Sequence, residues 1–179
     1  MKKILPLISI FAISACVAPS TPPPPPTQQQ APQQVTVTPA PAPQPRPAGD
    51  WRDWPITPGD WVYRQDTRGS IALFGEAGQS ANFMVRCDRA QKKIFLSRTG
   101  TTQRQARMLV RTTATDRNLP ASNAGGTPPY IAAEVAVYDD ILDKIAFSRG
   151  RFTVEVSSTS ALAIPIWPEF TRVVEDCRK

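Results

Sequence analysis

The sequence predicts a mainly β domain, either an antiparallel sandwich or a small barrel, with a short helix near residues 139–147 and a C-terminal helix near residues 168–177. Two observations predict this class. Short runs of the chain alternate apolar and polar residues at period two, which is typical of half-buried strands. The last run instead places its apolar residues three and four positions apart, as along one face of a helix.

Five strands are expected in the first half of the domain. Their alternating runs lie around Trp61 and Tyr63, around Ile71 and Leu73, and along residues 81–87, 92–97 and 106–113. The run 81–87 has the clearest pattern, because Phe83, Val85 and Cys87 share one face. A strand buried on that face explains the pattern.

The second half mixes strands and helices. Glycine and proline residues predict a loop over residues 116–129. Residues 131–137 fit either a strand or a helix, since three alanines and a glutamate dilute the β signal, and we expect a strand. A helix is expected over residues 139–147, where Asp139 or Asp140 can cap the first turn.

Two further strands and a helix complete the domain. Residues 151–157 return to strict alternation, and residues 161–164 make one more short strand. Pro168 suits the first turn of the last helix, because its missing N–H has no partner there in any case. The apolar positions of this helix have the spacing i, i+3, i+4, i+7: Phe170, Val173, Val174 and Cys177.

Composition divides the 179 residues into three parts. Residues 17–48 hold 12 of the 20 prolines and no aromatic residue, so they cannot bury enough apolar surface to fold. All four tryptophans and all three tyrosines lie between residues 49 and 179. We therefore expect a signal peptide over residues 1–15, a Pro/Gln-rich disordered linker over 16–48 and one β-rich domain over 49–179.

The first residues have the layout of a secretory signal. Lys2 and Lys3 precede an apolar run that is too short for a stable membrane-spanning helix. The run Ile13-Ser14-Ala15-Cys16 that follows resembles the lipobox of bacterial lipoproteins. This resemblance implies that Cys16 is acylated, becomes the new N-terminus and anchors the protein to a membrane. The alternative is an ordinary signal peptide cleaved near Ala15.

The residues after Cys16 bear on sorting and reach. Val17 and Ala18, rather than an aspartate, follow the cysteine, which is similar to lipoproteins sorted to the outer membrane. We expect an outer-membrane lipoprotein whose domain faces the periplasm. An extended proline-rich linker of 32 residues spans roughly 100 Å, at about 3.1 Å per residue. The linker is read as a spacer, with a docking motif for a polyproline-binding partner as the alternative.

Lipidation of Cys16 would leave two cysteines in an oxidising compartment. Cys87 lies on the apolar face of its expected strand, and Cys177 lies on the apolar stripe of its expected helix. We expect these two to form a disulfide that pins the helix to the sheet. Free or redox-active thiols are the alternative, although the two cysteines lack the Cys-x-x-Cys spacing.

The composition restricts catalysis. The chain has no histidine, which excludes serine–histidine and cysteine–histidine catalysis and the commonest zinc sites. Asp139, Asp140 and Asp143 are explained by helix capping better than by a metal or a carboxylate pair. Ser148 and Lys144 imitate a serine–lysine dyad at a spacing that is common by chance. No catalytic residue, metal or cofactor is predicted.

Basic residues supply the candidate binding sites. Eight of them lie between residues 86 and 111, and Arg149 and Arg151 flank a glycine between a helix and a strand. Arg149, Arg151, Arg107 and Arg111 are the candidate anion-binding residues. The alternative is that the basic run forms the solvent-facing sides of strands and that Arg149 and Arg151 complement a helix end. A nucleic-acid partner is not expected, since no aromatic residues interleave the basic run.

Four aromatic residues crowd the start of the domain, and we weigh two readings of them. Trp51, Trp54, Trp61 and Tyr63 either form a sugar-binding platform or seal the edge of the core. Elsewhere, the runs Phe147 to Phe152 and Pro165 to Arg178 are similar to uncharacterised envelope lipoproteins of alphaproteobacteria. That resemblance implies no activity.

The expected function is a non-enzymatic binding or accessory module of the cell envelope. Its partners would be the membrane, through Cys16, and an envelope protein or an anionic cell-wall polymer. The alternatives are an envelope hydrolase that uses Asp or Glu residues and an anchor that binds peptidoglycan.

Overall fold

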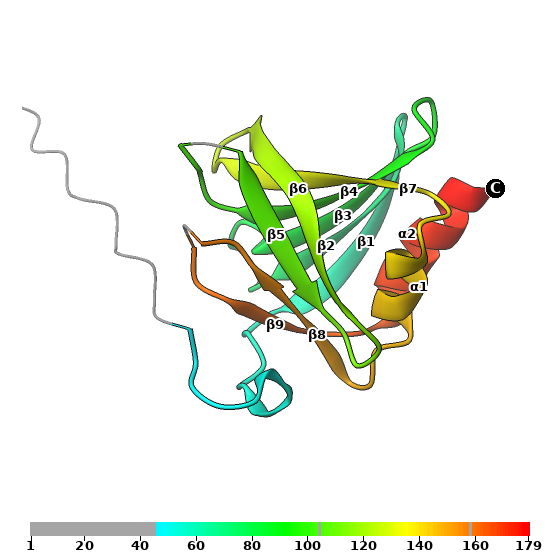
Figure 1. Cartoon of the computed structure of the whole chain (residues 1–179). Helices are drawn as coiled ribbons and strands as arrows, with labels where there is room; N and C mark the ends of the chain where they lie inside the picture. The colour runs from blue at the N-terminus through cyan, green and yellow to red at the C-terminus, as the bar shows by residue number, and fades with distance from the viewer. Residues whose placement is uncertain (1–45, 104, 158) are drawn as a thin grey trace, which may run out of the picture. The chain divides into compact units, whose positions relative to one another are not determined.

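The computed structural model describes residues 46–103, 105–157 and 159–179 (Figure 1). The expected signal peptide, the lipidation site Cys16 and nearly all of the expected linker lie outside these residues. Within the described part of the chain, no helix is both long and apolar enough to cross a membrane.

The described residues form one antiparallel sheet of nine strands with two α-helices, which confirms the predicted fold class. The order across the sheet is β1-β2-β3-β4-β7-β6-β5-β8-β9. The strands are β1 (Asp60–Asp66), β2 (Gly69–Gly75), β3 (Phe83–Asp88), β4 (Lys93–Thr99), β5 (Ala106–Arg111), β6 (Asp116–Gly125), β7 (Tyr130–Ala136), β8 (Arg151–Glu155) and β9 (Leu162–Pro165). The helices are a 3-10 turn η1 (Trp51–Asp53), α1 (Asp140–Ala146) and α2 (Pro168–Arg178).

The sheet is strongly curved, and its concave side holds the core (Figure 1). The indole N–H of Trp61 in β1 donates to the Pro165 carbonyl of β9 at 2.9 Å, so the two edges of the open sheet come together at this point. The Trp61 ring also lies 5.4 Å from the ring of Phe74 and 6.4 Å from that of Phe170. Aromatic rings at such distances attract each other beyond the burial of their area. Trp61 therefore belongs to the core.

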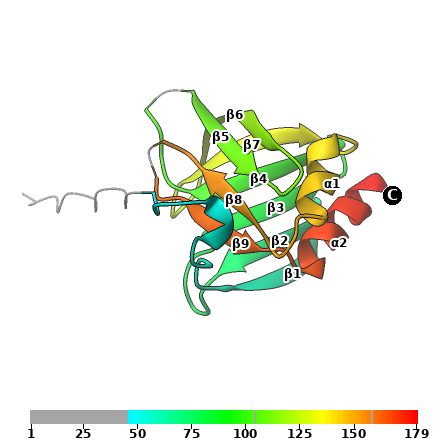
Figure 2. The same ribbon diagram turned by 60° about the horizontal axis from the view of Figure 1, so that its bottom comes forward.

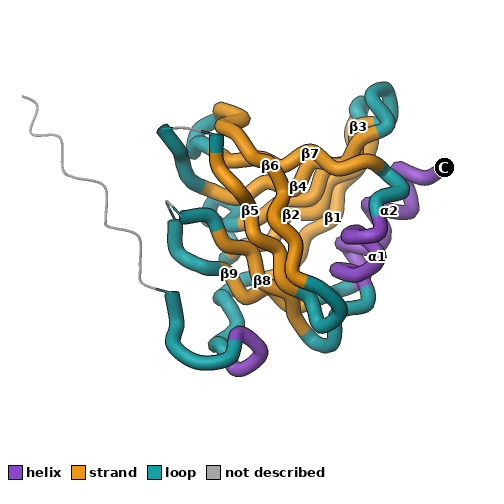
Figure 3. Tube along the Cα trace, in the orientation of Figure 1, coloured by secondary structure: helices purple, strands orange, loops and turns teal. Residues whose placement is uncertain are grey.

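The two α-helices lie side by side at one end of the sheet, away from η1 (Figure 3). Helix α2 packs on β1 to β4 with its predicted apolar stripe buried. Helix α1 begins where predicted, because the Asp139 side chain accepts a hydrogen bond from the Ile141 N–H at 2.9 Å. This bond satisfies one of the amides that have no partner within the helix.

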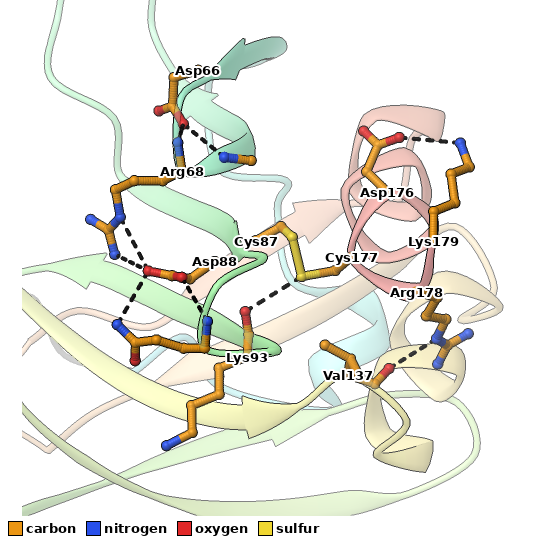
Figure 4. Close-up of a disulfide and its surroundings, with 12 residues drawn as sticks. Asp66, Arg68, Cys87, Asp88, Lys93, Val137, Asp176, Cys177, Arg178 and Lys179 are labelled. Carbon is orange, nitrogen blue, oxygen red and sulfur yellow. Dashed lines mark hydrogen bonds and ion pairs between the residues drawn. A yellow bond between two sulfur atoms is a disulfide. The ribbon is translucent and has the colours of Figure 1, made fainter.

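A disulfide joins Cys87 of β3 to Cys177 of α2, as the sequence predicts (Figure 4). The two Cα atoms are 5.4 Å apart, within the range of unstrained bridges. Close by, the Arg68 guanidinium holds the carboxylate of Asp88 at 2.9 Å. This hydrogen bond is the main reason that the pKa of Asp88 lies below its usual value. The bridge ties the C-terminal helix to β3, the third strand across the sheet.

The expected loop over residues 116–129 is wrong, because residues 116–125 form β6. Asn118, Pro120 and a glycine pair dilute the apolar alternation, yet Leu119 and Ala121 point into the core. The β6–β7 ladder begins only at Ala121, so Pro120 pairs with β5 alone. Its missing N–H therefore costs no bond to β7. Residues 131–137, ambiguous in the sequence, lie almost entirely in strand β7.

Candidate functional site

Residues 46–57, which we call the N-terminal strap, lie on the outer face of β8 and β9 (Figure 2). Trp51 and Trp54 are buried against Ala163 of β9. The Thr57 N–H donates to the Ala163 carbonyl at 2.9 Å, and the Thr57 hydroxyl accepts from the Ala163 N–H at 3.0 Å. The two tryptophans therefore seal the junction where the strap meets the sheet. Their burial disagrees with a sugar-binding platform.

An open hollow of about 650 Å³ lies between the strap, the β5–β6 turn and the α1–β8 turn. Its lining consists of Arg52, Thr113, Ala114, Phe147, Arg149 and Arg151. We call this place the arginine hollow. Three guanidinium groups border it, and none of the described lining residues carries a carboxylate. Its electrostatic potential should be positive, and it suits an anion.

The turn after α1 explains how two of these arginines are placed. The Ser148 hydroxyl donates to the Arg151 carbonyl at 2.6 Å and accepts from the Thr113 N–H at 3.1 Å. Gly150 has φ +77°, a left-handed conformation that favours glycine and reverses the chain into β8. The Ser148 hydroxyl thus holds the turn. It has no contact with Lys144, whose ammonium pairs with Asp140 at 2.7 Å, so the structure does not form a serine–lysine dyad.

The three guanidinium groups differ in the contacts that they already make within the described chain. The Arg151 guanidinium donates to the Trp54 carbonyl, and Arg52 pairs with Asp50 at 3.1 Å. The Arg149 side chain is exposed, and no ion pair or hydrogen bond holds it within the described chain. Phe147, next to it, is 81% exposed. Arg149 is therefore the cation that a ligand can engage without breaking an existing contact.

The other two predicted anion-binding residues lie elsewhere. Arg111 has its Nε 3.0 Å from a carboxylate oxygen of the buried Glu155, so its charge is already compensated. Arg107 is exposed on the outer face of β5 and borders two neighbouring hollows of about 740 and 440 Å³. The structure therefore brings Arg149 and Arg151 together but separates them from Arg107 and Arg111.

Four of the seven basic residues that the structure describes between residues 86 and 111 have partners within the fold: Arg86, Lys93, Arg98 and Arg111. Arg86 pairs with Asp66 at 2.6 Å, and Lys93 pairs with Glu134 at 2.5 Å. Arg98 points into the protein and donates to the carbonyls of Thr99 and Ser160; burial lowers its pKa to about 10. These contacts favour the interpretation that the run forms strand residues paired within the fold over a continuous free basic surface, although Arg98 lies inside and not on the solvent-facing side that this interpretation expected.

The acidic segment is also paired. Arg117 contacts both Asp139 and Asp140, and Arg178 holds Asp143 at 2.8 Å. No group of three or more potential ligands that could hold a metal ion occurs among the residues that the structure describes. Asp139 caps helix α1, and all three aspartates form ion pairs with arginines.

A second group of acidic residues lies on helix α2. The Tyr63 hydroxyl donates to the Asp176 carboxylate at 2.5 Å, at an open hollow of about 570 Å³ that Glu169 and Glu175 also line. Burial opposes ionisation of Asp176, but the hydrogen bonds from Tyr63 and Lys179 outweigh it and lower the pKa. Asp176 is therefore ionised at neutral pH.

Sequence reasoning missed three residues at these sites: Arg46, Arg52 and Glu155. Arg46 falls in the expected linker, and its Nε lies 2.6 Å from Glu155. Arg52 meets Arg149 only because the strap folds back onto the sheet. No local pattern pointed to these contacts, since each joins segments that are distant along the chain.

Comparison with known proteins gives no match: no family model, no curated protein and no solved structure matches the chain. The site is therefore interpreted from its own geometry and charge.

Proposed function

We propose that the chain is a lipid-anchored cell-envelope protein whose domain is a non-enzymatic binding or accessory module, and that the arginine hollow takes an anionic group. One observation supports this site. A single hollow is bordered by Arg52, Arg149 and Arg151, and none of its described lining residues carries a carboxylate. Asp50 partly compensates Arg52. The guanidinium groups of Arg149 and Arg151, on either side of Gly150, have no carboxylate partner in the described chain and repel one another and Arg52. Their convergence is favourable when an anion compensates them.

The ligand is a carboxylate or phosphate group of an anionic cell-wall polymer. A guanidinium offers two parallel N–H donors that match either group. The exposed Phe147 ring supplies an apolar wall beside the charges. An acidic patch of an envelope protein presents carboxylates as well, and the binding experiment separates the two sources.

The anchor rests on the lipobox. Acylated Cys16 would hold the protein in the outer membrane, and the proline-rich linker would let the domain reach periplasmic ligands over tens of ångströms. The test is labelling of cells with a radioactive fatty acid. The wild-type chain should carry label and fractionate with the outer membrane. A Cys16→Ser chain that still carries label and stays in the membrane would refute the anchor.

The hollow is tested with the full chain in detergent. Arg52→Gln with Arg149→Gln removes two charges there, whereas Arg64→Gln with Arg89→Gln removes two exposed charges elsewhere. The probes are inorganic phosphate in a titration and purified peptidoglycan in co-sedimentation. A hydrogen bond to a charged group is worth about 1.5–3 kcal/mol, so each lost contact should weaken binding by at least about tenfold.

Equal losses in the two variants would show that binding follows net charge and would refute the site. Phosphate binding without peptidoglycan sedimentation would favour an acidic envelope protein as the partner. Sedimentation that depends on Arg149 would favour the peptidoglycan anchor.

The hydrolase alternative is less well supported. A glycoside hydrolase needs one carboxyl group with a raised pKa as its general acid. The described carboxyl groups with a shifted pKa are all shifted downward: Asp50, Asp66, Asp88, Asp140 and Asp176. Release of soluble fragments from peptidoglycan by the wild-type chain and not by Asp176→Asn would favour the hydrolase.

A further inference from the structure

A buried carboxylate lies at the bottom of a second hollow on the same face of the sheet. Glu155 of β8 is 5% exposed and lines the hollow of about 740 Å³ that Arg107 also borders. Its two oxygens lie 3.0 Å from Arg111 Nε and 2.6 Å from Arg46 Nε. Neither N–H is aligned on an oxygen, so both carboxylate oxygens lack a hydrogen bond within the described residues. A buried carboxylate in this condition is poorly satisfied.

The two cations differ in how they are held. Arg111 belongs to β5 and is fixed by the sheet. Arg46 precedes η1, and its side chain is 58% exposed. The strap can therefore withdraw Arg46 without breaking any strand. Glu155 would then keep one misaligned cation and would favour another guanidinium in the place of Arg46.

The hollow continues across the sheet. The neighbouring hollow of about 440 Å³ shares Gln105, Ala106 and Arg107 with it and reaches Glu134 of β7. From β8 to β7 the order passes through β5 and β6. Three strand spacings are about 14 Å, the length of roughly four extended residues. This length suits a stretch of polypeptide better than a single small molecule.

We infer that Glu155 forms a socket for an arginine side chain of an extended polypeptide from a partner protein, and that Arg46 occupies this socket in cis until the partner displaces it. The inference is independent of the arginine hollow, because it rests on the carboxylate of Glu155 and the two hollows share no lining residue. Arg107, which has no partner within the described chain, lies where it can bind carbonyls of the peptide. The contact between Arg46 and Glu155 competes with the arginine of the partner. The partner must therefore bind more tightly, or be present at a higher concentration, than it would need to without Arg46.

The test measures binding of two five-residue peptides to the full chain in detergent by titration calorimetry. One peptide is acetyl-Ala-Ala-Arg-Ala-Ala-amide, and the other has citrulline, the uncharged isostere, in place of arginine. Arg46→Gln opens the socket, and Arg64→Gln removes an exposed charge outside it. A tethered side chain competes at an effective concentration of about 1 mM. If Arg46 binds the socket with an intrinsic Kd near 0.1 mM, the arginine peptide should bind roughly tenfold more tightly to Arg46→Gln.

The expected result is that Arg46→Gln gains affinity for the arginine peptide, that Arg64→Gln matches the wild type, and that the citrulline peptide does not bind. Glu155→Gln should abolish the gain when combined with Arg46→Gln. The comparison of Arg46→Gln with the wild type does not depend on the folding of the Glu155 variant, because Arg46 is an exposed residue of the strap.

Three outcomes overturn the inference. Equal affinity of the wild type and Arg46→Gln would show that Arg46 does not compete. Equal binding of the citrulline peptide would show that the charge is not recognised. A wild-type dimer in sedimentation that becomes monomeric on Arg46→Gln would assign the socket to Arg46 of a second copy.

Discussion

Removal of the disulfide, by Cys87→Ala with Cys177→Ala, should lower the free energy of unfolding by about 4–5 kcal/mol. The bridge closes a loop with a sequence separation of 90 residues. On the chain-entropy model a loop of that size restricts the unfolded chain by about this amount. The folded state should change little, since Phe170, Val173 and Val174 keep α2 buried against the sheet.

Urea unfolding of the full chain measures this effect. With a slope of about 2 kcal/mol per molar, the midpoint should fall by about 2 M. The slope itself should rise, because the unfolded chain without the bridge is more expanded. Cys16→Ser, which leaves the bridge intact, is the control. A loss below about 1 kcal/mol with an unchanged slope would contradict the reasoning.

Three further predictions concern stability. Phe170→Ala should cost about 3–5 kcal/mol, because the Phe170 ring is fully buried, and the exposed Phe147→Ala should cost almost nothing; equal thermal midpoints would contradict this. Asp139→Ala should cost about 1 kcal/mol through the lost N-cap, and a loss no larger than that of Asp140→Ala would contradict it. Burial opposes ionisation of Asp176, but hydrogen bonds, including that from Tyr63, lower its pKa in the folded state. The stabilisation of the folded state by ionised Asp176 is therefore fully present above the ordinary pKa of 3.8 and is lost as the pH falls through the lowered pKa. Tyr63→Phe should therefore cost about 1–2 kcal/mol at pH 7 and less below pH 4 in urea titrations, and a difference that stays constant with pH would refute the coupling.

Strong local patterns predicted the elements well. The alternation along residues 83–87 and the stripe of Phe170, Val173 and Val174 correspond to β3 and α2. Strand β6 was missed because only Leu119 and Ala121 supply its buried side. Strand β6 is stabilised by pairing with the flanking strands β5 and β7. The apolar pattern within residues 116–125 does not reveal that pairing.

The candidate site was predicted only in part. Arg149 and Arg151 were found because they flank a turn glycine, which is a local signal. The same reasoning grouped Arg98 with exposed residues, although it occupies an inward position after Ile94 and Leu96. An arginine can take the place of an apolar residue on the inward face of a strand. The density of charges along the sequence does not reveal which face such an arginine lies on.

The sequence by itself determined the fold class, both helices and the cysteine pair, since these depend on composition and on periodicity within short segments. Only the tertiary structure decided which arginines are free. Arg111 is compensated by Glu155, whereas Arg149 meets Arg52 across a hollow. The physical reason is that the charge state of a surface depends on distances between residues, and the order of strands in the sheet sets those distances for segments far apart in the chain.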